Sequence, residues 1–137
     1  MAIARDIMTG GTECIGENET LVAAAAKLRE LNIGSMPICG EDNRLKGMLT
    51  DRDIVVKCIA DGGDPHSVTA GVLAQGKPVT IGADDDVSEA LATMKAHQIR
   101  RLPVIDGHDL VGMLTQADVA RSLPEELVGE LVEYVSQ

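Results

Sequence analysis

The segment Gly47-Met48-Leu49-Thr50-Asp51-Arg52-Asp53 occurs a second time in the chain, in the related form Gly112-Met113-Leu114-Thr115-Gln116-Ala117-Asp118. These two stretches lie 65 positions apart. Upstream landmarks recur 66 positions apart: Ile15-Gly16 as Ile81-Gly82, Ile33 as Ile99, and Pro37 as Pro103. The second copy has therefore lost one residue between Pro103 and Gly112. So many landmarks in one order identify an internal repeat.

Each copy is predicted to form a strand, a helix, two further strands and a second helix. Short apolar segments at 12–15 and 79–81 precede an amphipathic helix in each copy. Thr20 and Asp86 stand at the N-cap positions of those helices. Strand pairs follow at 35–39 and 45–50 in the first copy and at 102–105 and 110–114 in the second, and the second helices start near Asp51 and Gln116.

The strand–helix–strand connection makes the first two strands of a copy parallel neighbours, and the third strand then pairs antiparallel with the second. One such unit leaves an apolar sheet face uncovered. We therefore predict an α/β (α+β) fold in which two βαββα repeats pack as a pseudo-two-fold pair. The predicted boundaries are 1–61 for the first repeat, 62–68 for a linker, 69–123 for the second repeat and 124–137 for an extra C-terminal helix.

Composition argues against several classes of function. Acidic residues outnumber basic residues 22 to 12, and the formal net charge of −10 disfavours binding to nucleic acid or to an anionic membrane surface. Aromatic residues make up 1% of the chain, too few for the stacking platforms that bind single-stranded nucleic acid. No apolar run reaches the roughly 18 to 20 residues of a membrane span, and the first residues do not resemble a signal peptide. We expect a cytoplasmic protein.

Both copies resemble the CBS-domain family, in which a tandem pair is often called a Bateman module. The likeness rests on the doubled Gly-x-h-Thr-x-x-Asp stretch, on Met36-Pro37-Ile38 and on Arg101-Leu102-Pro103-Val104, and it extends over residues 4 to 123. This resemblance implies clefts between the copies that bind adenosine-containing ligands such as AMP, ATP or S-adenosylmethionine. It also implies a homodimer that requires no cofactor and regulates a separate, unknown partner protein.

The candidate ligand-binding residues are Thr50, Asp53, Thr115 and Asp118, where the third strand of each copy meets the second helix. Unsatisfied N–H groups at a helix start attract phosphate, and each Thr hydroxyl can add a hydrogen bond. The resemblance implies that each Asp binds the two hydroxyls of a ribose. The alternative is a capping box, with Thr at the N-cap and an acid three residues later, which needs no ligand.

The two copies differ in charge around this motif. Asp51-Arg52 in the first copy becomes Gln116-Ala117 in the second, and Gly34-Ser35 becomes Arg100-Arg101. Arg100 and Arg101 are candidate phosphate-binding residues. The alternative, which explains Arg100 and Arg101 equally well, is an exposed pair that offsets the negative charge of the protein surface. If only one site binds a nucleotide, we expect it to be the site around Thr115 and Asp118.

Cys14 and Cys39 are placed on the two strands expected to be parallel neighbours, within reach of a disulfide. Cytosolic disulfides are rare, so two free thiols are the alternative, and Cys58 is expected in the core. A zinc site that combines Cys14 or Cys39 with His66 or His97 has no supporting spacing, so we expect no metal.

No catalytic motif is present, and we expect no enzyme. The main hypothesis is a stand-alone sensor of an adenosine-containing ligand. The rival hypothesis is a redox- or metal-responsive stress protein whose nucleotide clefts are vestigial.

Overall fold

The computed structural model describes residues 2–74, 76 and 78–122, and the chain divides into two compact units. Unit 2 contains residues 13–78, whereas unit 1 combines residues 1–12 with residues 79–137. The chain therefore runs from unit 1 into unit 2 and back again. The predicted C-terminal helix at 124–137 lies outside the described residues.

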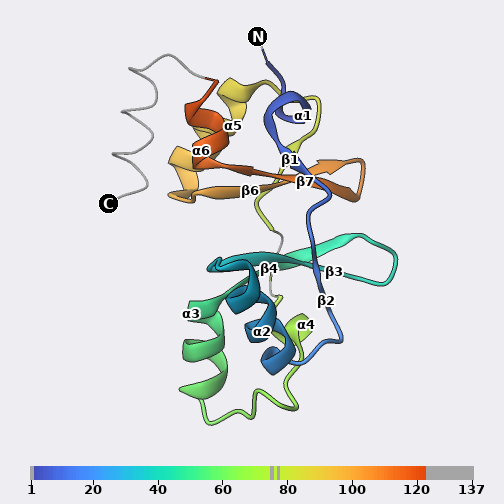
Figure 1. Cartoon of the computed structure of the whole chain (residues 1–137), viewed down its shortest axis with the longest axis vertical. Coiled ribbons are helices and arrows are strands. Elements are labelled where there is room, and N and C mark those ends of the chain that lie inside the picture. The colour runs from blue at the N-terminus through green and yellow to red at the C-terminus, as the bar shows by residue number, and fades with distance from the viewer. Residues whose placement is uncertain (1, 75, 77, 123–137) are drawn as a thin grey trace. The chain divides into compact units, whose positions relative to one another are not determined.

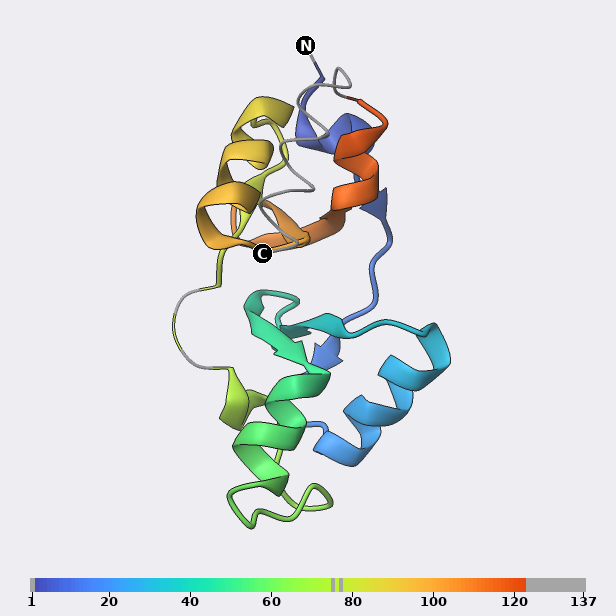
Figure 2. The same ribbon diagram turned by 90° about the vertical axis from the view of Figure 1, so that its left-hand side faces the viewer.

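Unit 2 has the architecture predicted for the first copy. Its elements are β2 (Ile15–Gly16), α2 (Leu21–Leu31), β3 (Ser35–Cys39), β4 (Leu45–Thr50), α3 (Asp51–Asp53), the π-helix η1 (Ile54–Ile59) and α4 (Ala70–Leu73). The sheet order is β2-β3-β4. Strand β2 runs parallel to β3, and β3 runs antiparallel to β4, as predicted. Helices α2 and η1 both cover one face of this sheet (Figure 1, Figure 2).

Unit 1 repeats this arrangement with one added strand. Its elements are α1 (Ala4–Ile7), β1 (Thr9–Gly10), β5 (Ile81–Gly82), α5 (Val87–His97), β6 (Arg101–Asp106), β7 (Asp109–Thr115) and α6 (Gln116–Ala120). The sheet order is β1-β7-β6-β5. Strands β5 and β6 are parallel, whereas β6 and β7 are antiparallel. The extra strand β1 pairs antiparallel with β7.

The two long helices begin and end as their sequences predict. The Ala23 N–H donates to Thr20 Oγ1 over 3.2 Å at the start of α2, and the Ser88 N–H donates to Asp86 Oδ1 over 3.0 Å at the start of α5. Each helix ends at a residue in the left-handed region, Asn32 (φ 53°) and Gln98 (φ 52°). The predicted N-caps are confirmed.

Each sheet has a proline in an interior strand, Pro37 in β3 and Pro103 in β6. Proline cannot donate a ladder hydrogen bond, which normally confines it to an edge. The neighbouring strands β2 and β5 are short, and they begin to pair only at Ile38 and Val104, one residue after each proline. Each proline therefore lies just outside the part of its strand that pairs with the short neighbouring strand, where no ladder hydrogen bond to that neighbour is required.

Each unit has its own apolar core, in which the described residues include no aromatic side chain. In unit 1, α5 contributes Val87, Ala90, Leu91 and Met94 to a cluster with strand residues such as Leu102 and Leu114. In unit 2, α2 contributes Leu21, Ala24 and Leu28 to a cluster that includes Ile38, Leu49 and the predicted core residue Cys58. Aliphatic side chains in close packing supply the main stabilising free energy of both units.

Each core is completed by a short segment that lies outside the repeat it packs on. The N-terminal arm, residues 2–10, packs on the second copy, and the inter-repeat arm, residues 68–74, packs on the first copy. Ala4 and Ala70 are both fully buried. Their N–H groups donate over 2.8 Å to Asp85 O and to Glu19 O, at positions that correspond in the two units. The compact units therefore do not coincide with the repeats predicted at 1–61 and 69–123.

Candidate functional site

The turn between β4 and α3 holds the first candidate pair in a reciprocal arrangement. The Asp53 N–H donates to Thr50 Oγ1 over 3.0 Å, and the Thr50 N–H donates to Asp53 Oδ2 over 3.1 Å. The second carboxylate oxygen, Oδ1, lies 3.4 Å from the Lys57 ammonium. This is the capping box that the sequence offered as an alternative to ligand binding. The Asp53 side chain is 22% exposed, so a carboxylate edge remains open to solvent.

The turn between β7 and α6 repeats this capping box with a more buried acid. The Asp118 N–H donates to Thr115 Oγ1 over 3.1 Å, and the Thr115 N–H donates to Asp118 Oδ2 over 2.9 Å. Arg121 donates from Nη2 to Asp118 Oδ1 over 2.5 Å. The Asp118 side chain is only 5% exposed, whereas that of Arg121 is 72% exposed. Both oxygens of this carboxylate therefore have a partner within the protein.

The two arginines proposed for phosphate binding lie beside Thr115. Arg101 opens β6 and is paired with Thr115 across the sheet, and the Gln116 N–H donates to Arg100 O over 2.8 Å. Arg100, Arg101, Thr115, Gln116, Ala117 and Ala120 line a hollow of about 420 Å³. The buried Nε of Arg101 has no hydrogen-bond partner among residues 78–122 or elsewhere in the described chain. A buried guanidinium N–H without a partner is costly. Because Arg101 lines the hollow, its guanidinium is also suited to form charge-assisted hydrogen bonds with an anion there.

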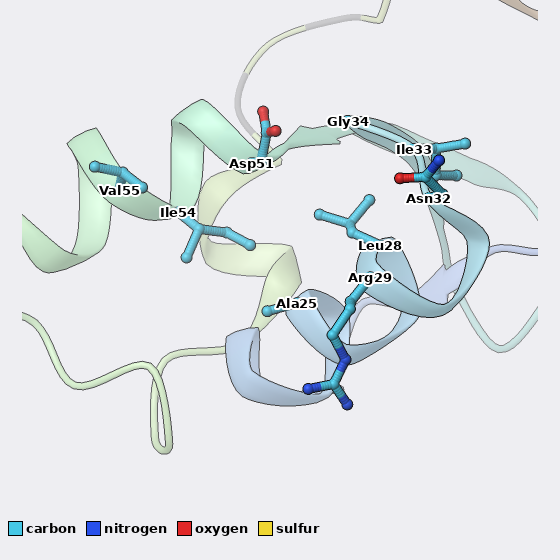
Figure 3. A pocket seen from close by; sticks show the side chains of 9 residues that line it. All are labelled: Ala25, Leu28, Arg29, Asn32, Ile33, Gly34, Asp51, Ile54 and Val55. Atoms are coloured by element: carbon cyan, nitrogen blue, oxygen red, sulfur yellow. The ribbon is translucent and has the colours of Figure 1, made fainter.

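A corresponding hollow of about 550 Å³ lies in unit 2, between α2 and the helix formed by α3 and η1 (Figure 3). Leu28 and Ile54 point toward one another across it, while the carboxylate of Asp51 lies near Gly34. Gly34 and Asp51 stand where unit 1 has Arg100 and Gln116. This hollow therefore has apolar side chains at its centre, with Arg29 and Asp51 also in its lining. At the two corresponding positions, unit 2 has a glycine and an acid where unit 1 has an arginine and a neutral amide.

The structure brings together only some of the predicted site residues. Arg100, Arg101 and Thr115 line one hollow, but Asp118 does not line it. In unit 2 neither Thr50 nor Asp53 lines the larger hollow. Sequence reasoning also missed Lys57 and Arg121, the cationic partners of the two acids. The signal was available, because a base three or four residues after an acid on a helix commonly pairs with it.

Cys14 and Cys39 form a disulfide in the structure, with their Cα atoms 5.7 Å apart. The bridge joins the segment before β2 to the end of β3, where Gly16 pairs with Cys39. The remaining thiol, Cys58, is buried. The residues that the structure describes contain no group of three or more His, Cys, Asp or Glu placed to hold a metal ion. Nor does this part of the chain contain a helix long and apolar enough to cross a membrane.

The doubled α/β unit and its two Thr-x-x-Asp turns define a class of tandem-repeat domain. The model of the CBS domain matches residues 4–59 and 72–125. The chain belongs to the CBS-domain family.

Hypoxic response protein 1 of Mycobacterium tuberculosis is 52% identical to the chain over 135 residues, which cover 98% of the chain and 94% of that protein. The crystal structure of Hypoxic Response Protein I with two coordinated zinc ions is similar, with 54% identity and a TM-score of 0.83, and the match covers 90% of the chain and all of that structure. The crystal structure of CBSX2 in complex with AMP shares the fold at 22% identity, with a TM-score of 0.77 and coverage of 89% and 96%.

Proposed function

We propose that the chain is a stand-alone regulatory module that binds an adenosine-containing ligand and signals to a separate partner protein. The observation that carries the proposal is that Arg101 lines the unit 1 hollow beside Thr115, while its buried Nε has no hydrogen-bond partner among the described residues. A guanidinium forms charge-assisted hydrogen bonds with an anionic group such as phosphate. Membership of the CBS-domain family and the AMP bound to CBSX2 support adenosine as the remainder of the ligand.

Regulation in this proposal follows from binding without catalysis. A ligand changes the shape of a protein only to the extent that it binds two conformations with different affinity. The ligand would favour one conformation of the chain, and the partner protein would recognise that conformation. The proposal thus needs an equilibrium between states rather than a reaction.

Calorimetric titration with AMP, ATP and S-adenosylmethionine tests this function. We expect heat of binding with a phosphorylated nucleotide and a loss of affinity of at least about tenfold in Arg101→Gln. Arg44→Gln is the matched control, because Arg44 is an exposed hairpin residue that pairs with Asp42. If none of the three compounds produces heat or a thermal shift, the nucleotide proposal is wrong.

The rival function, a redox-responsive stress protein, is favoured by the Cys14–Cys39 disulfide. Disulfides are uncommon in the reducing cytosol, so a disulfide that forms there would indicate that the protein has been exposed to oxidising conditions. The zinc ions belong to the structure of Hypoxic Response Protein I. In this chain the bridge and a zinc–thiolate site exclude one another at these two cysteines, because zinc binds thiolates and not disulfides.

Thiol counting separates the redox function from the nucleotide function. Intact-mass analysis after alkylation should find one free thiol in oxidised, denatured protein and three after reduction. Zinc should then be added to the reduced protein, and the zinc that remains bound after gel filtration should be measured by elemental analysis. Three thiols under both conditions would remove the redox proposal without affecting nucleotide binding.

We further propose a homodimer formed through the helical face of unit 2. Val55 and Ile59 of η1 are 56% and 54% exposed, and Val55 lines the apolar hollow. The same hollow carries the guanidinium of Arg29 and the carboxylate of Asp51. A two-fold contact places one patch against its own copy, so these opposite charges are suited to pair across it. Light scattering should show a dimer for the native chain and for the swapped pair Arg29→Asp/Asp51→Arg, and a monomer for Arg29→Asp alone.

A further inference from the structure

The carboxylate of Asp118 is held between two donors of unequal mobility. Thr115 donates a backbone N–H to Oδ2 over 2.9 Å, and that N–H is fixed by the strand–helix turn. Arg121 donates to Oδ1 over 2.5 Å from the end of a long side chain that is 72% exposed. Asp118 itself is almost fully buried. The Arg121 guanidinium is therefore the partner that solvent and an incoming ligand reach first.

We propose that Arg121 is a latch: a positioning residue that occupies Oδ1 of Asp118 and has to move before ribose hydroxyls bind this carboxylate. The inference rests on the proposed function, since it concerns the adenosine ligand of that site. Arg121 sets how readily the second copy accepts a ribose.

Arg121 is the group that moves because of its length and exposure. Releasing it returns a flexible, charged side chain to water, where it regains both hydration and rotamer freedom. Releasing the Thr115 N–H instead would leave a backbone donor of the capping box without a partner. The nucleoside then replaces one charge-assisted hydrogen bond to Oδ1 with its own hydroxyl hydrogen bonds.

The first copy lacks an equally tight latch. Lys57 lies 3.4 Å from Asp53 Oδ1, and the Asp53 side chain is already 22% exposed. An ammonium on a flexible stem has no planar fork that matches a carboxylate, so it holds Asp53 less firmly. The two copies therefore differ in access: Asp53 is open to a ribose, whereas Asp118 is closed. This order is the reverse of the order expected from the sequence.

Paired titrations of the full chain test the latch. The background is Asp53→Asn, which leaves the second copy as the acid-bearing site, and the probes are adenosine and 2′,3′-dideoxyadenosine. We expect Arg121→Gln to tighten adenosine binding about tenfold, since one charge-assisted hydrogen bond no longer competes. The same substitution should leave dideoxyadenosine unchanged, because that nucleoside has no hydroxyls for Asp118. Lys57→Gln, in an otherwise native chain, is the matched control and should change adenosine affinity less than about threefold.

A salt series supplies a readout that a purely structural role would not move. Adenosine is uncharged, so raising NaCl from about 0.05 M to about 0.5 M acts on the protein's ion pair and not on the ligand. Adenosine affinity should rise with salt in the Asp53→Asn background and should stay constant once Arg121→Gln is added. Thermal melts of each variant confirm that it is folded.

Three outcomes overturn the latch. Unchanged adenosine affinity in Arg121→Gln shows that Arg121 does not compete, and weaker affinity shows that Arg121 itself contacts the ligand. An equal gain for both nucleosides shows that Arg121 acts through something other than Asp118. If no adenosine compound binds the native chain or any variant, the proposed function fails together with the latch. Binding to the native chain without the expected gain is the failure of the latch alone.

Discussion

Asp53 and Asp118 occupy one position of one motif, and the difference in their burial decides what a substitution does at each. When a buried carboxylate that accepts two hydrogen bonds is replaced by an amide, one acceptor oxygen is lost and the remaining hydrogen bond is no longer strengthened by charge. An acid that solvent can reach is replaced more easily, because water takes over its hydrogen bonds. Identical motifs therefore have unequal energetic roles in the two units.

Asp118→Asn should lower the free energy of unfolding by about 1–3 kcal/mol, because the Arg121 guanidinium and the Thr115 N–H lose a charged acceptor. Asp53→Asn, the matched substitution, should cost less than about 1 kcal/mol, because its ion pair with Lys57 is partly exposed. Urea denaturation of both variants measures the difference. Equal losses would show that burial does not distinguish the two acids.

Asp42, in the hairpin between β3 and β4, gives a prediction about pH. Its pKa is lowered chiefly by the Arg44 backbone N–H, which donates to Asp42 Oδ1 over 3.0 Å, and also by the charges of Lys46 and Arg44. A lowered folded-state pKa stabilises the protein above the ordinary value near 3.8 and loses that effect as the pH falls through the folded value. The difference in urea midpoint between native chain and Asp42→Asn should therefore shrink below about pH 4. A difference that is constant from pH 7 to pH 3 would contradict the assignment.

At the scale of elements, hydrophobic period and turn chemistry predict the strands and long helices. Leu28 and Met94 fall on the buried faces of α2 and α5, and Thr20 and Asp86 cap them. The arms could not be predicted, because they are too short to show a period. Aligned at an offset of 66, they share only Ala4 with Ala70, with Ile7 and Leu73 as similar residues. Similarly, nothing in the β-branched run Ile54-Val55-Val56 indicates a π-helix. The hydrogen-bond register of a π-helix depends on tertiary packing, which a local pattern does not show.

The arms carry their own prediction. Ala4→Leu and Ala70→Leu should each lower the free energy of unfolding by about 1–3 kcal/mol, because both positions are fully buried and a larger side chain overpacks the core. Ala96→Leu on the exposed side of α5 is the control and should be nearly neutral. Chemical denaturation checks all three. A neutral Ala4→Leu would show that the N-terminal arm is not packed on unit 1.

For the molecule as a whole, the sequence predicts a repeat and a charge asymmetry, but it does not predict how the chain is shared between compact units. The site was predicted in part. The capping residues and the arginines beside Thr115 follow from residue types, whereas the burial of Asp118 depends on packing that no local pattern encodes. Lys57 and Arg121 are an intermediate case. Their spacing from Asp53 and Asp118 predicts that each pairs with its acid, but it does not predict how strong the ion pair is.

Reduction of the disulfide should affect the two units unequally. Cys14 and Cys39 are 25 positions apart, and closing a loop of that size stabilises a protein by about 3.5 kcal/mol in the chain-entropy description. Because both cysteines belong to unit 2, a reductant should increase hydrogen exchange in α2 and β3 and leave β6 and β7 less affected. Cys14→Ser/Cys39→Ser is the control and should not respond to the reductant. A uniform increase across both units would contradict a local effect.

The pairing of β1 with β7 has a consequence for the order of events on the ribosome. Thr9 pairs with Met113, so the strand that receives the N-terminal arm is synthesised 104 residues after it. At the ordinary rate of translation that delay is about 5–20 s. Unit 2 is a continuous segment of residues 13–78, so it is complete well before unit 1 can close. During that interval the apolar residues of the arm have no docking site, and a nascent-chain chaperone has its opportunity to bind there.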